Sequence, residues 1–361
     1  MGNSTPGAWM GMIRMGREGA GYGLGATVAN YFWPCVNSVG GAGDDNVVPS
    51  NCHAGTRGEA ESHATRHTQD GRISVDVGPD NISQLLFAVH GSATLVATMG
   101  ATLHFAQHNI ATGDDGLPGS LTMWKDMGHA ALTPGSTSVM QVPGVVLTGY
   151  DVAIAPRSLL RMDLDYFAQQ EVVAAATMTP VLSALQPFVA LPHLALELGG
   201  VSIADKLVNA NIRYNGNAVR RENAGTRYAS GSHALRGSCE CRLTLDFDDM
   251  REVADWFGTS PTTTPALPMA MTWPKNTEVL EFEWQSDELG STTLPYELTA
   301  YMPRYRFTAV GRELPEGADA VFRLDITGRA LRRETSPTLN PLTGEIIWQV
   351  HNRQTTANIT T

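Results

Sequence analysis

Two pairs of histidines have the spacing that zinc sites on helices use, namely His63 with His67 and His104 with His108. Neither segment has the apolar periodicity of a helix. In a strand, residues four positions apart lie about 13 Å from each other, which is too far for both to bind one ion. We therefore interpret the four histidines as solvent-exposed or interface residues and not as metal ligands.

Cys239 and Cys241 are one residue apart, which places both thiols on one face of a strand. A closed tetrahedral zinc site would need two further Cys or His ligands at close spacing. The remaining candidates, Cys35, Cys52 and His53, are distant in the sequence. Four cysteines are also too few for a disulfide framework in a chain of 361 residues. The sequence predicts reduced thiols in a protein made in a cytoplasm, with no bound metal.

No other motif predicts catalysis or a cofactor. The glycine-rich run at residues 19–25 has no strand before it and no amphipathic helix after it, so it lacks the context of a nucleotide-binding loop. The chain has no Gly-x-Ser-x-Gly motif and no Walker-type lysine after a glycine loop. Adjacent acids such as Asp114–Asp115 more often cap helices or face solvent. We expect a protein that is not an enzyme and that binds no cofactor.

The composition is that of a globular chain rich in turns, with 42% hydrophobic and 17% charged residues, 36 Gly and 20 Pro. A formal net charge of −11 argues against tight binding of nucleic acid, which requires an excess of Lys and Arg. The sequence has neither a signal-peptide pattern nor an apolar run of roughly 18 residues, the length of a membrane span. We therefore expect no membrane binding by this chain.

The sequence contains two copies of one pattern, a predicted strand followed by a predicted short helix. Residues 72–77 alternate polar and apolar side chains, as in a half-buried strand, and residues 242–247 repeat the pattern 170 positions later (242 − 72). Each strand is followed by an aspartate and then by apolar residues at i, i+3, i+4 and i+7, which predict a short amphipathic helix that ends at a glycine. The two apolar stripes are Ile82, Leu85, Leu86 and Val89 before Gly91, and Met250, Val253, Ala254 and Phe257 before Gly258.

A later strand is repeated as well, because residues 159–165 match residues 321–326 with an offset of 162 (323 − 161). A strand, a helix and a strand that recur in this order indicate a tandem duplication. We predict a mainly β fold of two β-sandwich or barrel domains, each with one flanking short α-helix. The predicted segments are an N-terminal arm at 1–30, β domains at 31–185 and 186–335, and a C-terminal arm at 336–361. Further strands are expected at 94–106, 119–126, 144–154, 194–203, 207–214, 279–285, 296–309 and 319–327.

Each predicted domain contains a long polar loop before its repeated strand, near residues 40–70 and 215–237. Loops of this length in compact domains are often functional. The first loop tends to be acidic and the second basic, so the two are suited to contact each other across a subunit interface. The candidate contacts are Asp44, Asp45, Glu59 and Glu61 in the first loop, and Arg220, Arg221, Arg227 and Arg236 in the second.

Several segments, taken in order, resemble the major tail tube proteins of long-tailed bacteriophages. Residues 17–27 contain a Glu, a Tyr-Gly and an Ala-Thr ahead of the aromatic strand at 31–33, and this arrangement is similar to the opening arm of that family. The later segments that resemble the family are residues 117–123, 144–152 and 208–217. The similarity spans most of the chain and lies in the order of short patterns.

The resemblance implies β-sandwich subunits that form six-fold rings, which stack into a hollow tube. A chain with two such domains would form a homotrimeric ring with pseudo-six-fold symmetry. The protein would then be a structural virion protein of the phage tail, assembled in the host cytoplasm. The implied partners are further copies of the chain, the tape measure protein, the tail terminator and distal tail proteins, with double-stranded DNA passing through the tube without specific binding.

The acidic balance would have a role in such a tube, because an electronegative lumen does not retain DNA during ejection. The candidate lumen-facing acids lie on the repeated strands and are Asp76, Asp163, Asp246 and Asp325. The alternative, that these acids face neighbouring subunits or solvent, stays open.

Two other functions also stay open on the sequence. One is another virion assembly protein, such as a tail terminator, a baseplate hub or a capsid decoration protein. The other is a carbohydrate-binding or carbohydrate-active β-sandwich that stacks sugars on tryptophan. The tryptophans available for this are Trp9, Trp33, Trp124, Trp256, Trp273, Trp284 and Trp348.

Overall fold

The fold is mainly β, as predicted, and a single α-helix occurs among the residues that the structure describes. The computed structural model describes residues 12–19, 22–23, 31–32, 34, 36–50, 61–79, 82–98, 106–112, 119–126, 139–174, 186–223, 227–233, 236–247, 278–290, 293–313, 322–332 and 344–354. Residues outside these ranges include the second predicted helix near 250–257.

In the first half of the chain, the described residues form ten strands and the helix. They are β1 (Met12–Arg17), β2 (Tyr31–Phe32), β3 (Val36–Ser50), β4 (Glu61–Asp76), α1 (Ile82–His90), β5 (Gly91–Thr98), β6 (Ala106–Thr112), β7 (Leu121–Asp126), β8 (Val139–Ile154), β9 (Arg161–Ala168) and β10 (Val172–Val173).

The described part of the second half forms ten strands and one turn of 3-10 helix. They are β11 (Leu194–Leu198), β12 (Val201–Ser202), η2 (Ala204–Lys206), β13 (Leu207–Asn215), β14 (Val219–Arg221), β15 (Gly231–His233), β16 (Ser238–Phe247), β17 (Glu278–Leu289), β18 (Pro295–Glu313), β19 (Phe322–Ala330) and β20 (Ile347–Asn352).

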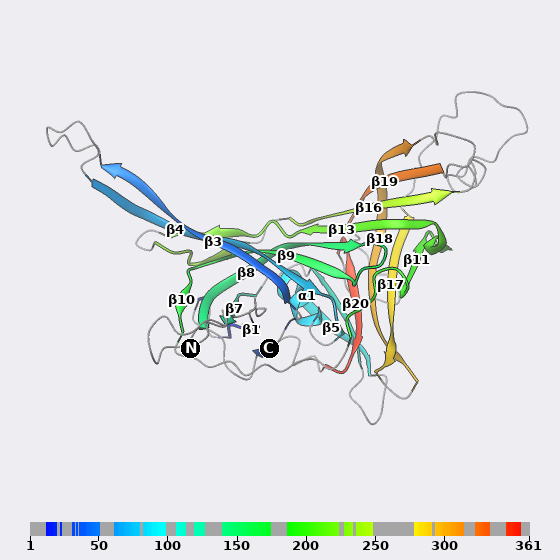
Figure 1. Ribbon diagram of the computed structural model, residues 1–361, viewed down its shortest axis with the longest axis horizontal. Coiled ribbons are helices and arrows are strands. Elements are labelled where there is room, and N and C mark those ends of the chain that lie inside the picture. Colours follow the sequence, from blue (N-terminus) through cyan, green and yellow to red (C-terminus); the bar gives the residue numbers. More distant parts are fainter. Residues whose placement is uncertain are drawn as a thin grey trace, which may run out of the picture.

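Helix α1 has the predicted position and the predicted buried stripe. Ile82, Leu85, Leu86 and Val89 are all buried, and the helix packs beneath the sheet against β6 and β8 (Figure 1). It ends at Gly91, whose φ of 76° is a left-handed conformation that favours glycine. The apolar periodicity therefore predicted both the helix and its end.

Eight strands from both halves form one continuous antiparallel sheet in the order β3–β4–β9–β8–β13–β16–β19–β18. Strands β8 and β18 are long, and the N-terminal part of each also joins a second group of strands. The N-terminal part of β8 pairs with β7 and β10, and that of β18 pairs with β17 and β20. The hydrophobic core lies between these layers and α1.

The strands of the two halves pair in the same register. Ile73 lies opposite Leu164 in β4–β9, and Leu243 lies opposite Ile326 in β16–β19. The offsets between these positions are 170 (243 − 73) and 162 (326 − 164), which are the offsets of the repeated sequences.

β-Bulges also recur at equivalent places in the two halves. The register shifts at residues 36–38 in β3 and at 207–209 in β13, an offset of 171 (207 − 36). It shifts again at residues 147–149 in β8 and at 307–309 in β18, an offset of 160 (307 − 147). Because a bulge is a local insertion of one residue, its recurrence at the same two places supports a duplicated domain. The domain boundaries themselves stay a prediction.

Four segments differ from the sequence-based expectation. Most of the predicted polar loop at 40–70 belongs to a long hairpin of β3 and β4, which projects beyond the body of the sheets at the upper left of Figure 1. Part of each expected terminal arm is strand: β1 pairs with β7, and β20 inserts between β18 and β6. The strand expected at 94–106 is divided, because β5 ends at Thr98 and β6 begins at Ala106.

A buried polar network lies under the junction of the two halves. His90 is fully buried, and its Nε2 and Nδ1 each lie 3.0 Å from a hydroxyl, that of Tyr150 and that of Thr112 respectively. Trp348 Nε1 donates a hydrogen bond of 2.7 Å to Tyr150 Oη, and the hydroxyls of Thr112 and Tyr214 are 2.7 Å apart. Because β6, β8, β13, β20 and α1 each contribute one group, the network ties the halves together.

Burial of His90 makes the stability of the subunit sensitive to acid. The loss of solvation lowers the pKa of His90 to about 3. Below about pH 6.5 the unfolded chain takes up a proton at this position and the folded chain does not, so stability falls as the pH falls toward 3. In urea titrations of unassembled subunits, His90→Gln should lose about 2–3 kcal/mol less than wild type between pH 7 and pH 4.5.

The matched control is His233→Gln, because His233 is exposed on β15. It should follow the wild-type dependence on pH. An equal loss for His90→Gln and wild type would show that His90 is not held neutral in the folded chain.

Candidate assembly surface

The outer face of the eight-stranded sheet is the face turned away from the core, and polar side chains cover it. Along β16 the side chains alternate, with Cys241 and Leu243 buried and Glu240 and Arg242 exposed. The same period of two holds along β13 and places Arg213 outside. One face of this sheet therefore builds the core and the other is available to solvent or to partners.

The four predicted lumen-facing acids all lie on this outer face, in equivalent pairs. The hydroxyl of Ser74 donates a hydrogen bond to Asp163, and the hydroxyl of Thr244 donates one of 2.7 Å to Asp325. Position 74 corresponds to 244 (offset 170), and 163 corresponds to 325 (offset 162). The two halves thus repeat a side-chain contact as well as a strand pattern.

The second pair of acids repeats an ion pair. Asp76 lies 3.7 Å from the guanidinium of Arg161, measured from Oδ1 to Nε. Asp246 accepts two hydrogen bonds from Arg323, of 2.8 and 3.1 Å. The offsets are again 170 and 162. This ion pair links β4 to β9 in the first half and β16 to β19 in the second half.

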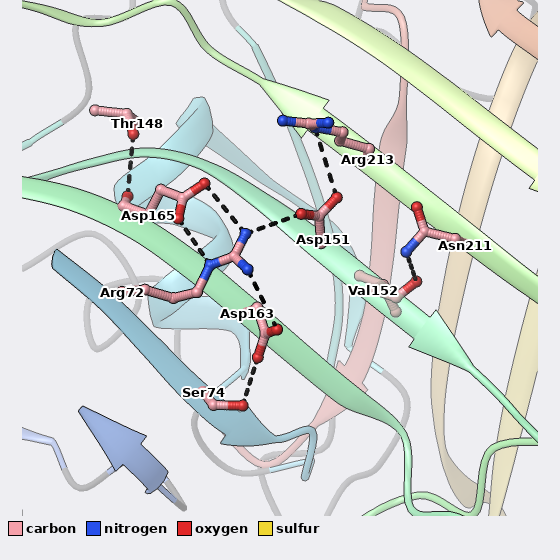
Figure 2. Close-up of polar contacts among 9 residues, drawn as sticks. All are labelled: Arg72, Ser74, Thr148, Asp151, Val152, Asp163, Asp165, Asn211 and Arg213. Carbon is pink, nitrogen blue, oxygen red and sulfur yellow. Dashed lines mark hydrogen bonds and ion pairs between the residues drawn. The ribbon is translucent and has the colours of Figure 1, made fainter. Parts of the chain in front are cut away.

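Arg72 lies among three aspartates beside the β8–β13 junction (Figure 2). Its guanidinium is 2.8 Å from Asp165, 3.0 Å from Asp151 and 3.8 Å from Asp163. The hydrogen bond to Asp165 is the largest cause of a raised pKa of Arg72. Asp151 also lies 3.7 Å from Arg213 of β13, so one carboxylate contacts cations of both halves.

Charge is distributed unequally between the halves. On the central strands of the first half, the described outer-face charges are Asp70, Arg72, Asp76, Asp151, Arg161, Asp163 and Asp165. On those of the second half, they are Arg213, Glu240, Arg242, Asp246, Arg323, Asp325 and Arg329. The first set sums to −3 (2 − 5) and the second to +1 (4 − 3). Net acidity on this face therefore belongs to the first half.

The basic segment at 215–237 contacts the acidic hairpin within one chain. Arg220 forms an ion pair with Asp70 of β4, donates a hydrogen bond of 2.9 Å to the carbonyl of Gln69, and lies over the ring of Phe167. The amide of His67 donates a hydrogen bond of 2.9 Å to the carbonyl of Arg227. The hairpin of β14 and β15 thereby covers part of the outer face of the first half.

The other predicted loop contacts are placed only in part. Arg221 on β14 and Arg236 are exposed. The backbones of Asp44 and Asp45 lie in β3 and that of Glu61 begins β4, whereas their side chains and all of Glu59 lie outside the described residues. The structure therefore brings the two segments together at Arg220 and Arg227 and leaves the remaining predicted contacts as predictions.

Two strand edges of the continuous sheet have no partner among the residues that the structure describes. One is the edge of β3 opposite β4, and the other is the edge of β18 opposite β19 over residues 309–313. Small residues occur on both edges, namely Gly40, Gly41 and Gly43 on β3 and Ala309 and Gly311 on β18. Sequence reasoning missed these edges, although the cluster of glycines at 40–43 was a signal for close approach of another backbone.

The candidates for metal or sugar binding are not assembled into a site within the described parts of the chain. Cys239 and Cys241 are free, buried thiols, and burial raises the pKa of both. No group of three His, Cys, Asp or Glu residues that could hold a metal occurs in these ranges. His108 is buried in β6, and His67 lies in β4. His104 and the side chain of His63 lie outside the described residues. Trp124, Trp284 and Trp348 are buried in the core, and the other four tryptophans lie outside the described residues.

The family model described as phage tail tube protein matches residues 15–330, which is most of the chain. The chain belongs to the phage tail tube protein family. A search of the curated proteins gave no significant match.

Membership of this family makes the chain a structural component of a phage tail tube and therefore a virion protein. The matched range contains all the strands of the continuous sheet, both of its open edges and the four acids of the outer face. Within the described ranges no helix is both long and apolar enough to span a membrane.

The cluster around Arg72 predicts a difference between the halves of this tail tube protein. Arg72→Ala should lower the free energy of unfolding by about 1 kcal/mol at low salt, because three aspartates would lose their shared cation. The loss should shrink in about 1 M salt, where exposed charges are screened. Urea titrations of unassembled subunits at both salt concentrations would measure it.

Arg242→Ala is the matched control, because position 242 is equivalent to 72. The positions equivalent to Asp151, Asp163 and Asp165 are Gly311, Asp325 and Thr327, so one acid replaces three. Arg242→Ala should therefore have less than half the effect of Arg72→Ala. Equal effects at both sites would show that the aspartate cluster contributes nothing to stability.

Proposed function

We propose that this protein is the major tail tube subunit, and that three chains close into a ring in which each half occupies one of six equivalent places. The observation that supports this is the pairing of β8 with β13, which joins the two halves edge to edge in one sheet. An edge-to-edge junction between two copies of one domain is a head-to-tail contact, and such contacts generate rings when the rotation between copies closes.

The rings would stack into a hollow tube. The long hairpin of β3 and β4 projects from the body of the subunit, which suits it to reach a neighbouring ring (Figure 1). The acids Asp44, Asp45, Glu59 and Glu61 on and near this hairpin, with Arg221 and Arg236 on the basic segment, are the contacts that we propose for stacking.

The outer face of the sheet would line the lumen and provide the passage for DNA during ejection. Its first half has a net negative charge on the central strands, which would repel the phosphates of double-stranded DNA, and its second half is close to neutral. The four acids Asp76, Asp163, Asp246 and Asp325 would then face the lumen. Ion pairing and hydrogen bonding hold each of them in place along the wall.

The remaining partners follow from the position of a tube in a tail. We propose that the ends of the tube contact the tail terminator and the distal tail proteins, that the tape measure protein occupies the lumen before ejection, and that the tube is assembled in the host cytoplasm. A tail terminator, a baseplate hub or a capsid decoration protein is the alternative, because such proteins also form rings or discrete particles without extended stacking.

Electron microscopy of the purified protein tests this proposal. Negatively stained samples at high protein concentration should contain stacked rings with a central channel, and native mass spectrometry of single rings should give three chains. Rings that never stack would favour the terminator or hub alternative. A monomer at all concentrations and salts would contradict both.

A further inference from the structure

A lysine, a glutamate and a glutamine of the first half meet at one carboxylate oxygen. Lys125 Nζ lies 3.3 Å from Glu171 Oε2, and Gln69 Nε2 donates a hydrogen bond of 3.2 Å to the same oxygen. Because both nitrogens contact one atom, the amine of Lys125 and the amide of Gln69 are close neighbours. An amine, an amide and a carboxylate that touches both are the groups needed to form an isopeptide bond.

The amine and the amide come from opposite layers of the fold. Gln69 lies on β4 of the continuous sheet, on the side of the strand that also carries the buried Ile73. Lys125 lies on β7 of the second layer, on the side that carries the buried Met123. Glu171 lies in the short connection between β9 and β10. A bond between Gln69 and Lys125 would therefore join the two layers directly.

These groups are largely shielded from water. Gln69 is 2% exposed, and the side chains of Lys125 and Glu171 are 11% and 29% exposed. Gln69 Oε1 is buried, and no hydrogen-bond donor contacts it among the residues that the structure describes. Burial without a donor destabilises an amide oxygen, and the exclusion of water favours joining an amine to an amide over hydrolysis.

The second half has no amide at the equivalent position. Position 239 corresponds to 69, with the offset of 170 that relates β16 to β4, and it is a buried free cysteine. The fold therefore accepts a small side chain of low polarity at this place, so the sheet can be built without the amide of Gln69.

We propose that Lys125 and Gln69 form an isopeptide bond within the chain, with Glu171 as the group that transfers protons. Glu171 first takes a proton from the Lys125 ammonium group, which leaves a neutral amine. Half a turn of the Gln69 amide then places Oε1 against the protonated Glu171, and this hydrogen bond polarises the carbonyl group. The amine of Lys125 attacks Cδ of Gln69.

The reaction releases ammonia. The bond that forms joins Lys125 Nζ to Gln69 Cδ, and the bond that breaks joins Gln69 Cδ to Nε2. Glu171 donates its proton to the leaving nitrogen, takes one from the attacking nitrogen and passes that proton to the ammonia. In sum, an ammonium group and a carboxamide become a secondary amide and an ammonium ion, without an oxidant or a cofactor.

The product would be a covalent brace between the layers of the first half. A cross-link between positions 69 and 125 restricts the unfolded chain, as a disulfide does, and so stabilises the folded subunit. Unlike a disulfide, an isopeptide bond is not broken by thiols, so it persists in a reducing cytoplasm. The inference concerns a single chain and goes beyond the proposed function, because it does not depend on how the subunits assemble.

Mass spectrometry of the denatured, full-length protein tests the bond. The wild-type chain should be lighter than its sequence by one molecule of ammonia, both as unassembled subunits and as assembled tubes. Trypsin does not cut after an acylated lysine, so residues 67–72 should be found joined to an uncut peptide of residues 73–157. A full mass in both samples, with the peptides of residues 67–72 and 73–125 recovered separately, would overturn the proposal.

Two substitutions test the roles of the residues. Lys125→Arg keeps the cation but not the nucleophilic amine, and Glu171→Gln removes the proton carrier, so both variants should have the full mass. The matched control is Lys206→Arg, because Lys206 contacts Asp205 instead and its replacement should leave the loss of ammonia unchanged. A Glu171→Gln variant that cross-links as completely as wild type would contradict the mechanism. The wild-type measurement stands even if a variant fails to fold.

The position of the mass change decides against the competing reaction. The sequence Asn215–Gly216 can also lose ammonia, by closing to a succinimide, and that product contains no branched peptide. A loss of ammonia located at residues 215–216, with Lys125 cleavable by trypsin, would overturn the isopeptide bond. Either result leaves the tube function as it stands, since that function is tested by the rings and their stacking.

Discussion

Backbone hydrogen bonding between β8 and β13 joins the two similar halves of the chain into one sheet, and most other features of the molecule depend on that junction. Among the described residues, the continuous sheet ends in two open edges, that of β3 and that of the C-terminal part of β18. These two strands are equivalent to β13 and β8, which pair with each other at the junction. Open edges are a liability in a monomer, because they offer unpaired backbone groups to any other strand. In the ring that we propose, neighbouring chains would cover both edges.

Packing beneath the junction makes the angle between the halves a fixed property of the chain. Tyr150 and Tyr214 stack at 5.4 Å between ring centroids, one from each half, and His90 and Trp348 bond to the same group of hydroxyls. A buried network of this kind is destabilising if any member is left unsatisfied, so it allows few relative orientations. If the halves occupy equivalent places in a ring, this packing sets the rotation from one place to the next.

Much of the fold was predictable from the amino-acid pattern. Alternation identified β4, β9, β16 and β19 and their internal repetition, and the 3.6-residue period identified α1 with its terminal glycine. Residues 40–70, most of which belong to the β3–β4 hairpin, were expected to form a loop because the glycines at 40–43 and the polar residues after them lack apolar alternation. A strand that lies on an edge, or extends past the core, need not bury a face, so its sequence has no reason to show one.

The sequence predicted the acidic residues of the candidate assembly surface but did not predict its open strand edges. Asp76, Asp163, Asp246 and Asp325 could be found because they sit at polar positions of repeated strands. Their partners could not, since the contact of Arg72 with Asp151 joins residues 79 positions apart and depends on register. Strand order and free edges are properties of pairing, and apart from the glycines at 40–43 the local sequences of β3 and of the C-terminal half of β18 do not indicate it.

An electron cryo-microscopy reconstruction of the assembled tube, calculated without imposed rotational symmetry, would test the central claim most directly. The account predicts three chains per ring, six similar domains around the channel, and junctions between chains that superpose on the β8–β13 junction within a chain. Six chains per ring, or β3 edges that face away from β18 of the adjacent chain, would contradict it.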